Sequence, residues 1–302
     1  MPIRIVQSKQ NPRLKQLRRA LAKPLGDAEA GGRMLAGIEG PNLLKEAVRA
    51  GLHIECVFVA EGSERLLDGL ALPAQTDILV TPAGLLDASL VTETPQAVAA
   101  LVETPDWTWA QVLDPARKDH ALVVVLAGLQ DPGNLGAVLR SAEAFGADGV
   151  LSLPGTANAW NPKAVRASAG SVFRLPVLEA SAELAIERLH EAGVKVWTTR
   201  TYGALRADLA DLAGATALLI GNEGNGVPPD LAARSDGALT IACPGRVESL
   251  NASVAAGVLL YEAARQRNVE GGFDLSHKNK NVARVGHREQ ARFPADGVEE
   301  ER

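Results

Sequence analysis

Five short apolar runs between Ala121 and Cys243 constrain the fold of this 302-residue chain more than any other feature. Continuous runs of this kind are typical of parallel strands that are covered on both faces of a sheet. Helical segments separate them, at about 134–145, 162–169 and 182–192. The alternation predicts a doubly wound α/β domain. The runs are ALVVVLAG, DGVLSL, VKVWTT, TALLIG and ALTIAC.

A long apolar segment follows the last run. After a turn at 244–245, a helix is predicted from about Ser249 to position 267. Apolar residues at 252–260 cover almost every direction around the helical period, so we expect this helix to be packed on several sides. Its polar first turn, with Glu248, Ser249 and Asn251, offers free N–H groups and the positive end of the helix dipole to a ligand. Capping by Ser249 is the simpler interpretation.

The front of the chain predicts a second, smaller α/β domain over residues 1–105. Asn11-Pro12 and Pro41 each begin a helix, and short strands are expected at 54–59 and 78–80. Glycines 31, 32 and 37 predict a loop and turn before Ile38. Residues 106–120 are interpreted as a linker, 121–268 as the doubly wound domain and 269–302 as a disordered tail.

Basic residues gather at the N-terminal end, although the net charge of the chain is −5. Positions 1–26 contain seven Lys and Arg residues and no carboxylate. Four of them lie opposite the leucine stripe of the first predicted helix, where they could contact phosphates or form an ordinary solvated face. Charge alone does not decide between the two. These residues are Arg13, Lys15, Arg18 and Arg19.

Composition narrows the class of protein. No apolar run is long enough to span a membrane, and the chain begins without an apolar signal segment, which predicts a soluble cytoplasmic protein. Cys56 and Cys243 stand far apart without a second ligand cluster, so neither a disulfide framework nor a metal site is expected.

Ligands of open α/β sheets bind beyond the carboxyl ends of the strands, so the loops there are the candidate sites. In QDPGNLGAVLR, Arg140 lies opposite the apolar side of its helix, beside the small residues Gly136, Ala137 and Ala144. It is accessible to a large anionic or planar partner, unless it forms a surface ion pair with Glu143. Without the other loops, the ion pair would be the better interpretation.

A glycine-rich loop, GNEGNGVPP, follows the run TALLIG. Its glycines permit close approach of the backbone to a ligand, and Glu223 among them is an unusual residue for packing. The dinucleotide fingerprint G-x-G-x-x-G is absent from the chain, which argues against a nicotinamide-dependent oxidoreductase.

Three segments of the chain resemble, in order, the three motifs of the SpoU/TrmH family of RNA ribose 2'-O-methyltransferases, in the SPOUT class. They are DPGNLGAVLRSAEAFG, LLIGNEGNGVP and IACPGRVESLNAS. The front part is similar, more loosely, to the family's RNA-binding extension, through Asn11-Pro12, Ile38-Glu39-Gly40 and Thr94-Pro95-Gln96. Ala242 stands where a proline is common in the family, and Ala97 stands where a glycine is usual. These two departures affect the geometry of the turns more than the chemistry.

The resemblance implies a trefoil-knotted parallel-sheet domain and a homodimer. It implies S-adenosylmethionine (AdoMet) as cofactor, held mainly by backbone groups near Thr199, Gly221, Ile241 and Leu250. The family's active-site positions fall on Arg140, Asn134, Glu223, Ser249 and Asn251. The N-terminal extension favours rRNA as substrate, with tRNA, or a non-catalytic RNA-binding role, as alternatives.

Physical chemistry suggests roles for these side chains. Because a guanidinium stays protonated in proteins, Arg140 is better suited to stabilise a developing alkoxide or grip a phosphate than to act as the family's general base. We expect Asn134 and Glu223 to orient Arg140 and the ribose. Ser249 and Asn251 are expected to fix the cofactor loop and the substrate.

Overall fold

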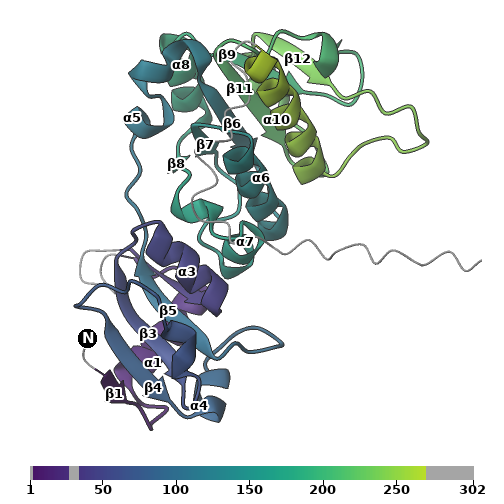
Figure 1. The fold of residues 1–302 in the computed structure, drawn as a ribbon. Helices are drawn as coiled ribbons and strands as arrows, with labels where there is room; N and C mark the ends of the chain where they lie inside the picture. Colours follow the sequence, from purple (N-terminus) through teal and green to yellow (C-terminus); the bar gives the residue numbers. More distant parts are fainter. Residues whose placement is uncertain (1–2, 27–33, 270–302) are drawn as a thin grey trace, which may run out of the picture.

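The computed structural model describes residues 3–26 and 34–269, which form two β-sheets with their helices (Figure 1). The N-terminal sheet has the order β1-β4-β3-β5-β2. β1, β4 and β3 are parallel, whereas β5 is antiparallel to β3 and β2. The strands are β1 (Ile3–Ile5), β2 (Leu35–Glu39), β3 (Ile54–Ala60), β4 (Asp77–Thr81) and β5 (Val98–Glu103). The helices are α1 (Pro12–Ala22), α3 (Pro41–Arg49), η1 (Glu64–Leu67) and α4 (Ala83–Asp87).

Both predicted helix starts in this part are confirmed. The Asn11 side chain accepts hydrogen bonds from the backbone N–H groups of Arg13 at 2.9 Å and Leu14 at 3.4 Å, and so caps α1. α3 begins at Pro41, and Gly51, with a φ of 71°, follows its end.

The loop predicted around Gly37 is wrong, because this residue lies in strand β2. This glycine is a strand residue against which α1 packs directly, since a Cβ atom there would lie 2.8 Å from the backbone nitrogen of Leu21. Glycine occurs both in turns and in strands that another backbone approaches closely, so the sequence alone favours a turn here. The predicted loop at glycines 31 and 32 lies outside the described residues.

The second sheet has seven strands, all parallel, in the order β10-β12-β9-β11-β6-β7-β8, and it confirms the doubly wound prediction. Its strands are β6 (Leu122–Ala127), β7 (Gly149–Ser152), β8 (Val177–Glu179), β9 (Lys195–Thr199), β10 (Leu205–Arg206), β11 (Thr216–Gly221) and β12 (Gly237–Thr240). The helices are α5 (Trp109–Val112), η2 (Pro115–His120), α6 (Pro132–Ala144), α7 (Pro162–Ala167), η3 (Ser171–Phe173), α8 (Ala182–Glu191), η4 (Ala207–Leu209), α9 (Pro229–Ala232) and α10 (Ala252–Val269).

Both faces of this sheet are buried, as the continuous apolar runs require. Along β6, Val124 packs in one cluster with residues of α6 and α10, whereas Val123 packs in another with residues of α5 and α8. The chain runs from β6 to β7 and β8 on one side and later returns to β11 on the other. The loops after β6 and β11 therefore meet at a topological switch point, where open α/β sheets bind ligands.

Helix α10 differs from its prediction in two ways. It begins at Ala252 rather than near Ser249, because the Asn251 side chain accepts from the N–H of Ser253 at 2.9 Å and caps it. It is buried on one side only, since Val254, Val258 and Tyr261 are 51%, 40% and 57% exposed. The rest of the helix packs against α6 (Figure 1). The implied knot stays a prediction.

The two sheets are joined by packing as well as by the chain. Arg174, after η3, forms ion pairs with Glu46 of α3 at 2.8 Å and Glu143 of α6 at 2.5 Å. The predicted linker contains α5 and η2, and Trp109 packs against the second sheet. The division into 1–105, 106–120 and 121–268 stays a prediction, and the predicted tail beyond Val269 lies outside the described residues.

Candidate active site

Three loops meet at the switch point through a chain of side-chain hydrogen bonds. Asn134 Nδ2 donates to Glu223 Oε1 at 3.0 Å, and Asn251 Nδ2 donates to Asn134 Oδ1 at 3.0 Å. The three residues follow β6, follow β11 and precede α10, respectively. Three of the five predicted catalytic positions are thus brought together.

The start of α6 places Asn134. Asp131 caps the helix by accepting from the N–H of Asn134 at 2.8 Å, and Pro132 occupies the first helical position. Lys163 of α7 forms an ion pair with Asp131 at 2.6 Å, and this contact lowers the pKa of the Asp131 carboxyl. The cap therefore stays ionised and keeps Asn134 in the first turn.

The loop after β11 is shaped by Asn222, which the sequence analysis missed. Its Nδ2 donates to the Gly128 carbonyl at 2.8 Å, and its Oδ1 accepts from the Gly224 N–H at 2.8 Å. An Asn followed by glycines is the signal of such a side-chain turn. Gly221 has no room for a side chain, since a Cβ atom would lie 2.1 Å from the carbonyl carbon of Gly226.

The Glu223 carboxylate is held in its charged form. Partial burial raises its pKa, but hydrogen bonds from the Asn134 side chain and from the backbone of Glu223, Gln130 and Asp131 outweigh burial. The net pKa lies below the ordinary value. Glu223 therefore accepts hydrogen bonds from two loops and is poorly suited to donate a proton.

Arg140 is exposed on α6 and makes no side-chain hydrogen bond or ion pair within residues 3–26 and 34–269. The alternative ion pair with Glu143 is wrong, because Glu143 binds Arg174 instead. Gly136 does not provide open space beside Arg140, because α7 packs directly against Gly136. A Cβ atom at position 136 would lie 2.3 Å from the Ala164 carbonyl oxygen. Arg140 is not hydrogen-bonded to Asn134 or Glu223, so the expected orienting contact is not present.

The third loop, 241–251, is open. Ser249 is exposed and lies outside the hydrogen-bonded chain of Asn134, Glu223 and Asn251. Tyr202 donates to the Glu248 carbonyl at 3.4 Å and supports this loop from the segment after β9. Within the described part of the chain, the backbone groups of Ile241 and Leu250 form no hydrogen bond.

These features leave backbone groups of the candidate site free for a ligand. The backbone groups of Ile241 and Leu250 are available to a ligand, and Gly221 lets the loop after β11 pass close to its strand. Thr199 is different, because its hydroxyl donates to the Leu219 carbonyl at 3.0 Å. Its side chain therefore supports the strands rather than facing a ligand.

The four predicted RNA contacts on α1 are not equivalent. Lys15, Arg18 and Arg19 are exposed, whereas Arg13 forms an ion pair with Glu55 of β3 that raises the pKa of the Arg13 guanidinium against the effect of its burial. Arg13 therefore holds α1 to the sheet.

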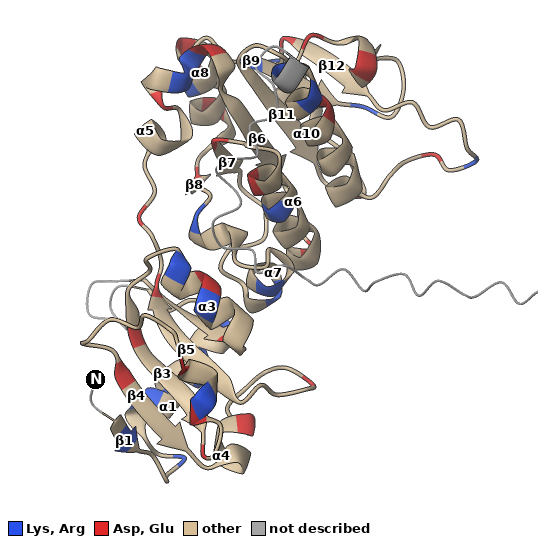
Figure 2. Ribbon diagram, in the orientation of Figure 1, with Lys and Arg blue, Asp and Glu red and all other residues tan. Residues whose placement is uncertain are grey.

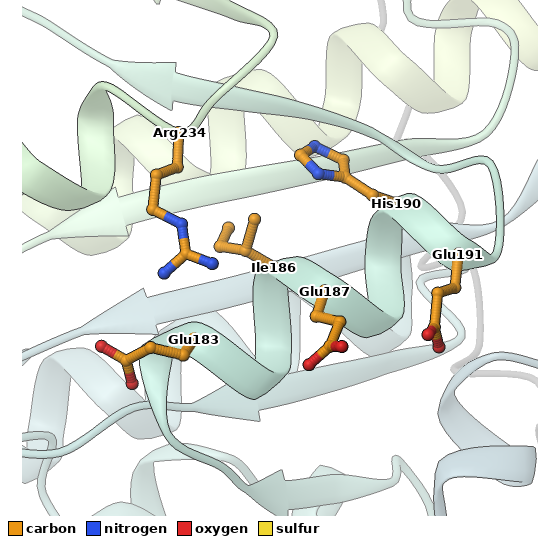
Figure 3. Close-up of a pocket in the computed structure, with 6 residues that line it drawn as sticks. All are labelled: Glu183, Ile186, Glu187, His190, Glu191 and Arg234. Carbon is orange, nitrogen blue, oxygen red and sulfur yellow. The ribbon is translucent and has the colours of Figure 1, made fainter.

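Other potential sites hold none of the predicted residues. An open cavity of about 620 Å³ lies on α8 and includes Glu187, His190 and Arg234 (Figure 3).

Within the described ranges, no cluster of three His, Cys, Asp or Glu residues could hold a metal ion. Burial raises the pKa of the Cys56 thiol to about 12. None of the helices in the described ranges is long and apolar enough to cross a bilayer.

Comparisons with known proteins identify relatives of this chain. The model of the SpoU rRNA Methylase family matches residues 121–261. The 23S rRNA (guanosine(2553)-2'-O)-methyltransferase RlmP of Bacillus subtilis is 35% identical over 224 residues, which are 74% of this chain and 86% of that protein.

Solved structures of similar proteins extend the likeness over both sheets. A crystal structure of an RNA 2'-O ribose methyltransferase has a TM-score of 0.73 and 31% identity, covering 87% of this chain and 99% of that one. The SpoU methyltransferase AviRb from Streptomyces viridochromogenes, in complex with AdoMet, has a TM-score of 0.73 and 29% identity, with 85% and 98% coverage. Its motifs, its parallel sheet and these likenesses show that the chain belongs to the SpoU rRNA methylase family.

Proposed function

We propose that this protein transfers the methyl group of AdoMet to a ribose 2'-hydroxyl in RNA, with ribosomal RNA as substrate. The observation that carries the proposal is the hydrogen-bonded chain from Glu223 through Asn134 to Asn251, which joins three loops at the switch point. The names of the similar proteins, RlmP and AviRb among them, support the reaction class. We also propose that the protein acts in the cytoplasm, which is consistent with a ribosomal RNA substrate.

Positioning is the main contribution of the chain to such a reaction. AdoMet supplies an electrophilic methyl group, and backbone groups near Gly221, Ile241 and Leu250 would hold it. Well-oriented reactants gain about 7 to 11 kcal/mol over a bimolecular encounter. The hydrogen bonds from Asn251 through Asn134 to Glu223 link the three loops, which reduces the cost of ordering them on binding.

Arg140 is the residue that we propose to act on the reacting ribose. Its guanidinium is exposed and free of a carboxylate partner among the described residues. Because guanidinium groups stay protonated in proteins, Arg140 lowers the barrier by stabilising the developing alkoxide or by binding the adjacent phosphate. Asn134 and Glu223 then shape the loops around the cofactor rather than orient Arg140 directly.

We further propose that the protein works as a homodimer through α6 and α10. The exposed residues Val254, Val258 and Tyr261 recur at helical spacing on α10. The ring of Tyr261 meets the ring of Phe145, directly after α6, edge to face with 5.8 Å between the ring centroids. An apolar stripe of this kind is typical of a protein interface. Arg140 lies on the neighbouring exposed face of α6, so a second copy would border the active site.

The test is direct. Purified protein is incubated with AdoMet carrying a labelled methyl group and with total bacterial RNA, and the modified position is then mapped. We expect label in 23S rRNA as a 2'-O-methylated nucleotide. Label confined to tRNA would mean that the substrate is tRNA rather than rRNA. An absence of label together with AdoMet binding would favour a non-catalytic RNA-binding protein.

A further inference from the structure

A second cavity lies between the two sheets, away from the loops of the proposed active site. It has a volume of about 490 Å³, which is within the range of sites for small molecules and nucleotides. The N-terminal part contributes the segment around Glu39 and the start of α3, and the other side comes from the end of α7. Its polar lining includes Glu39, Asn42, Thr94, Gln96 and Arg166.

Glu39 is a buried acceptor in this lining. It is 5% exposed. Its Oε1 accepts from the Thr92 hydroxyl and from the backbone N–H of Gln96, the latter at 3.2 Å. Its Oε2 is buried and has no hydrogen-bond partner among the described residues. An unsatisfied buried carboxylate oxygen is costly, so this atom calls for a donor that a ligand could supply.

The same cavity also offers donors for an anion. Arg166 of α7 is exposed and forms no ion pair within the described ranges. α3 begins at the cavity without a side-chain cap, since its N-cap is Gly40. The N–H of Asn42 therefore has no capping partner and stands at the positive end of the helix dipole.

We propose that this cavity binds one unpaired nucleotide of the RNA substrate, next to the nucleotides that reach Arg140. Arg166 and the start of α3 bind its phosphate, and Glu39 Oε2 accepts from an amino group on the edge of its base. Sequence-specific RNA recognition commonly uses splayed bases in this way. The inference rests on the proposed function, because it assumes that RNA is the substrate.

The position of the cavity relative to the active site is fixed by ion pairs. Glu46, which also lines the cavity, pairs with Arg174, and Arg174 pairs with Glu143 on α6. Glu143 is three residues from Arg140, and therefore close to it on the surface of α6. Lysines and arginines occur on α1, α3, α7 and α6 in turn, from one sheet to the other (Figure 2). An RNA strand can thus contact both sites.

Binding of short labelled RNA tests this inference without requiring catalysis. The probes are fluorescent decamers of cytidine, whose base has an amino group, and of uridine, whose base has none. We expect the full chain to bind the cytidine decamer about tenfold more tightly, the effect of one hydrogen bond to a charged group. Glu39→Gln should remove this preference, because its amide can present a donor in place of the carboxylate oxygen.

Arg166→Gln should weaken binding of both the cytidine and the uridine decamer. It should also make the negative slope of log affinity against log salt concentration shallower by about one, as for the loss of one phosphate contact. The matched control is Arg234→Gln, which removes the same charge at the cavity on α8 and should change neither quantity. Thr92→Val removes a hydrogen bond to Glu39 Oε1 and leaves Oε2 unchanged, so it should keep the preference for cytidine.

Four results would overturn the inference. The first is that the unaltered protein shows no preference for cytidine, and the second is that the preference survives Glu39→Gln. The third is equal binding by the Arg166→Gln and Arg234→Gln variants. The fourth is that the preference disappears in Thr92→Val as well, because Glu39 would then act only by holding its loop. Methyl transfer to total RNA is measured in parallel, because transfer without the preference refutes only this inference, whereas the preference without transfer refutes only the proposed function.

Discussion

Asn251 donates a hydrogen bond to Asn134 at 3.0 Å, although 117 positions separate the two residues along the chain. The other end of the Asn134 side chain donates to Glu223. One amide therefore ties the loop before α10 to the loop after β11. The arrangement of the site depends on this side chain having both a donor and an acceptor.

Asn134→Asp should break one of these two contacts. The new carboxylate can still accept from Asn251, but it cannot donate to Glu223 and repels it. We expect AdoMet affinity, measured by calorimetry, to fall about tenfold or more, as for the loss of a hydrogen bond to a charged group. Asn225→Ala, in the same loop as Glu223, is the control and should bind AdoMet normally. Unchanged affinity in Asn134→Asp would contradict the role of Asn134.

The stability of the site should be sensitive to acid. The pKa of Glu223 is lower in the folded protein than its ordinary value of 4.5, so its stabilising contribution is complete above that value and is lost as the pH falls through the folded-state pKa. We expect Glu223→Gln to show a shallower decline of Tm below about pH 4.5 than the unaltered protein. Thermal unfolding between about pH 3 and 6 measures this, and parallel curves would refute it.

Arg140→Ala should separate catalysis from cofactor binding. We expect kcat to fall about a hundredfold or more, by analogy with the removal of one oxyanion donor. AdoMet affinity should stay the same, because the Arg140 side chain forms no hydrogen bond or ion pair with the linked loops among the residues that the structure describes. Steady-state methylation and calorimetry give the two quantities, with Arg234→Ala as the control. Near-normal turnover in Arg140→Ala would exclude the proposed role.

Gly221 and Gly224 allow a matched comparison within one loop. A Cβ atom at Gly221 would lie 2.1 Å from the backbone of Gly226, whereas at Gly224 the nearest atom is Asn222 Oδ1 at 3.4 Å. Gly221→Ala should therefore lower the free energy of unfolding by about 1 to 3 kcal/mol or more and abolish AdoMet binding. Gly224→Ala should change stability by about 0.5 kcal/mol or less. Equal denaturation midpoints for the two variants would contradict the close approach.

Arg174 should set the relative position of the two sheets. Arg174→Gln removes the ion pairs to both Glu46 and Glu143. Because Arg174 is about one third exposed, the loss of unfolding free energy should be modest, about 1 kcal/mol, and smaller at high salt. Small-angle scattering should show a wider range of interdomain distances. An unchanged scattering profile would mean that the packing of α7 alone fixes the arrangement.

Much of the second sheet could be predicted, because its buried strands give continuous apolar runs that few other structures produce. Strand β2 could not, since Gly37 is present for the close approach of α1 rather than for a turn. The start of α10 was misplaced by three residues because Ser249 and Asn251 are equally good caps in a sequence, and only the structure shows that Asn251 is used.

The candidate site was predicted in part for a similar reason. The chemistry of their loops indicates Glu223 and Asn251, and the resemblance adds Asn134, but nothing in their spacing reveals that the three residues bond to one another. The interpretation of Arg140 depended on whether Glu143 was free to pair with it, and Glu143 pairs with an arginine 31 positions away. Sequence periodicity describes one helix at a time and carries no information about such distant partners.

The capping of α10 by Asn251 has a consequence for how a newly made chain matures. The Asn251 side chain caps the start of α10 and, through Asn134, contacts the beginning of α6. Ribosomes make α6 long before α10, so an unfinished chain carries the first two loops of the candidate site without the residue that joins them to the third. Enzymatic competence should therefore arise late in synthesis, once α10 docks.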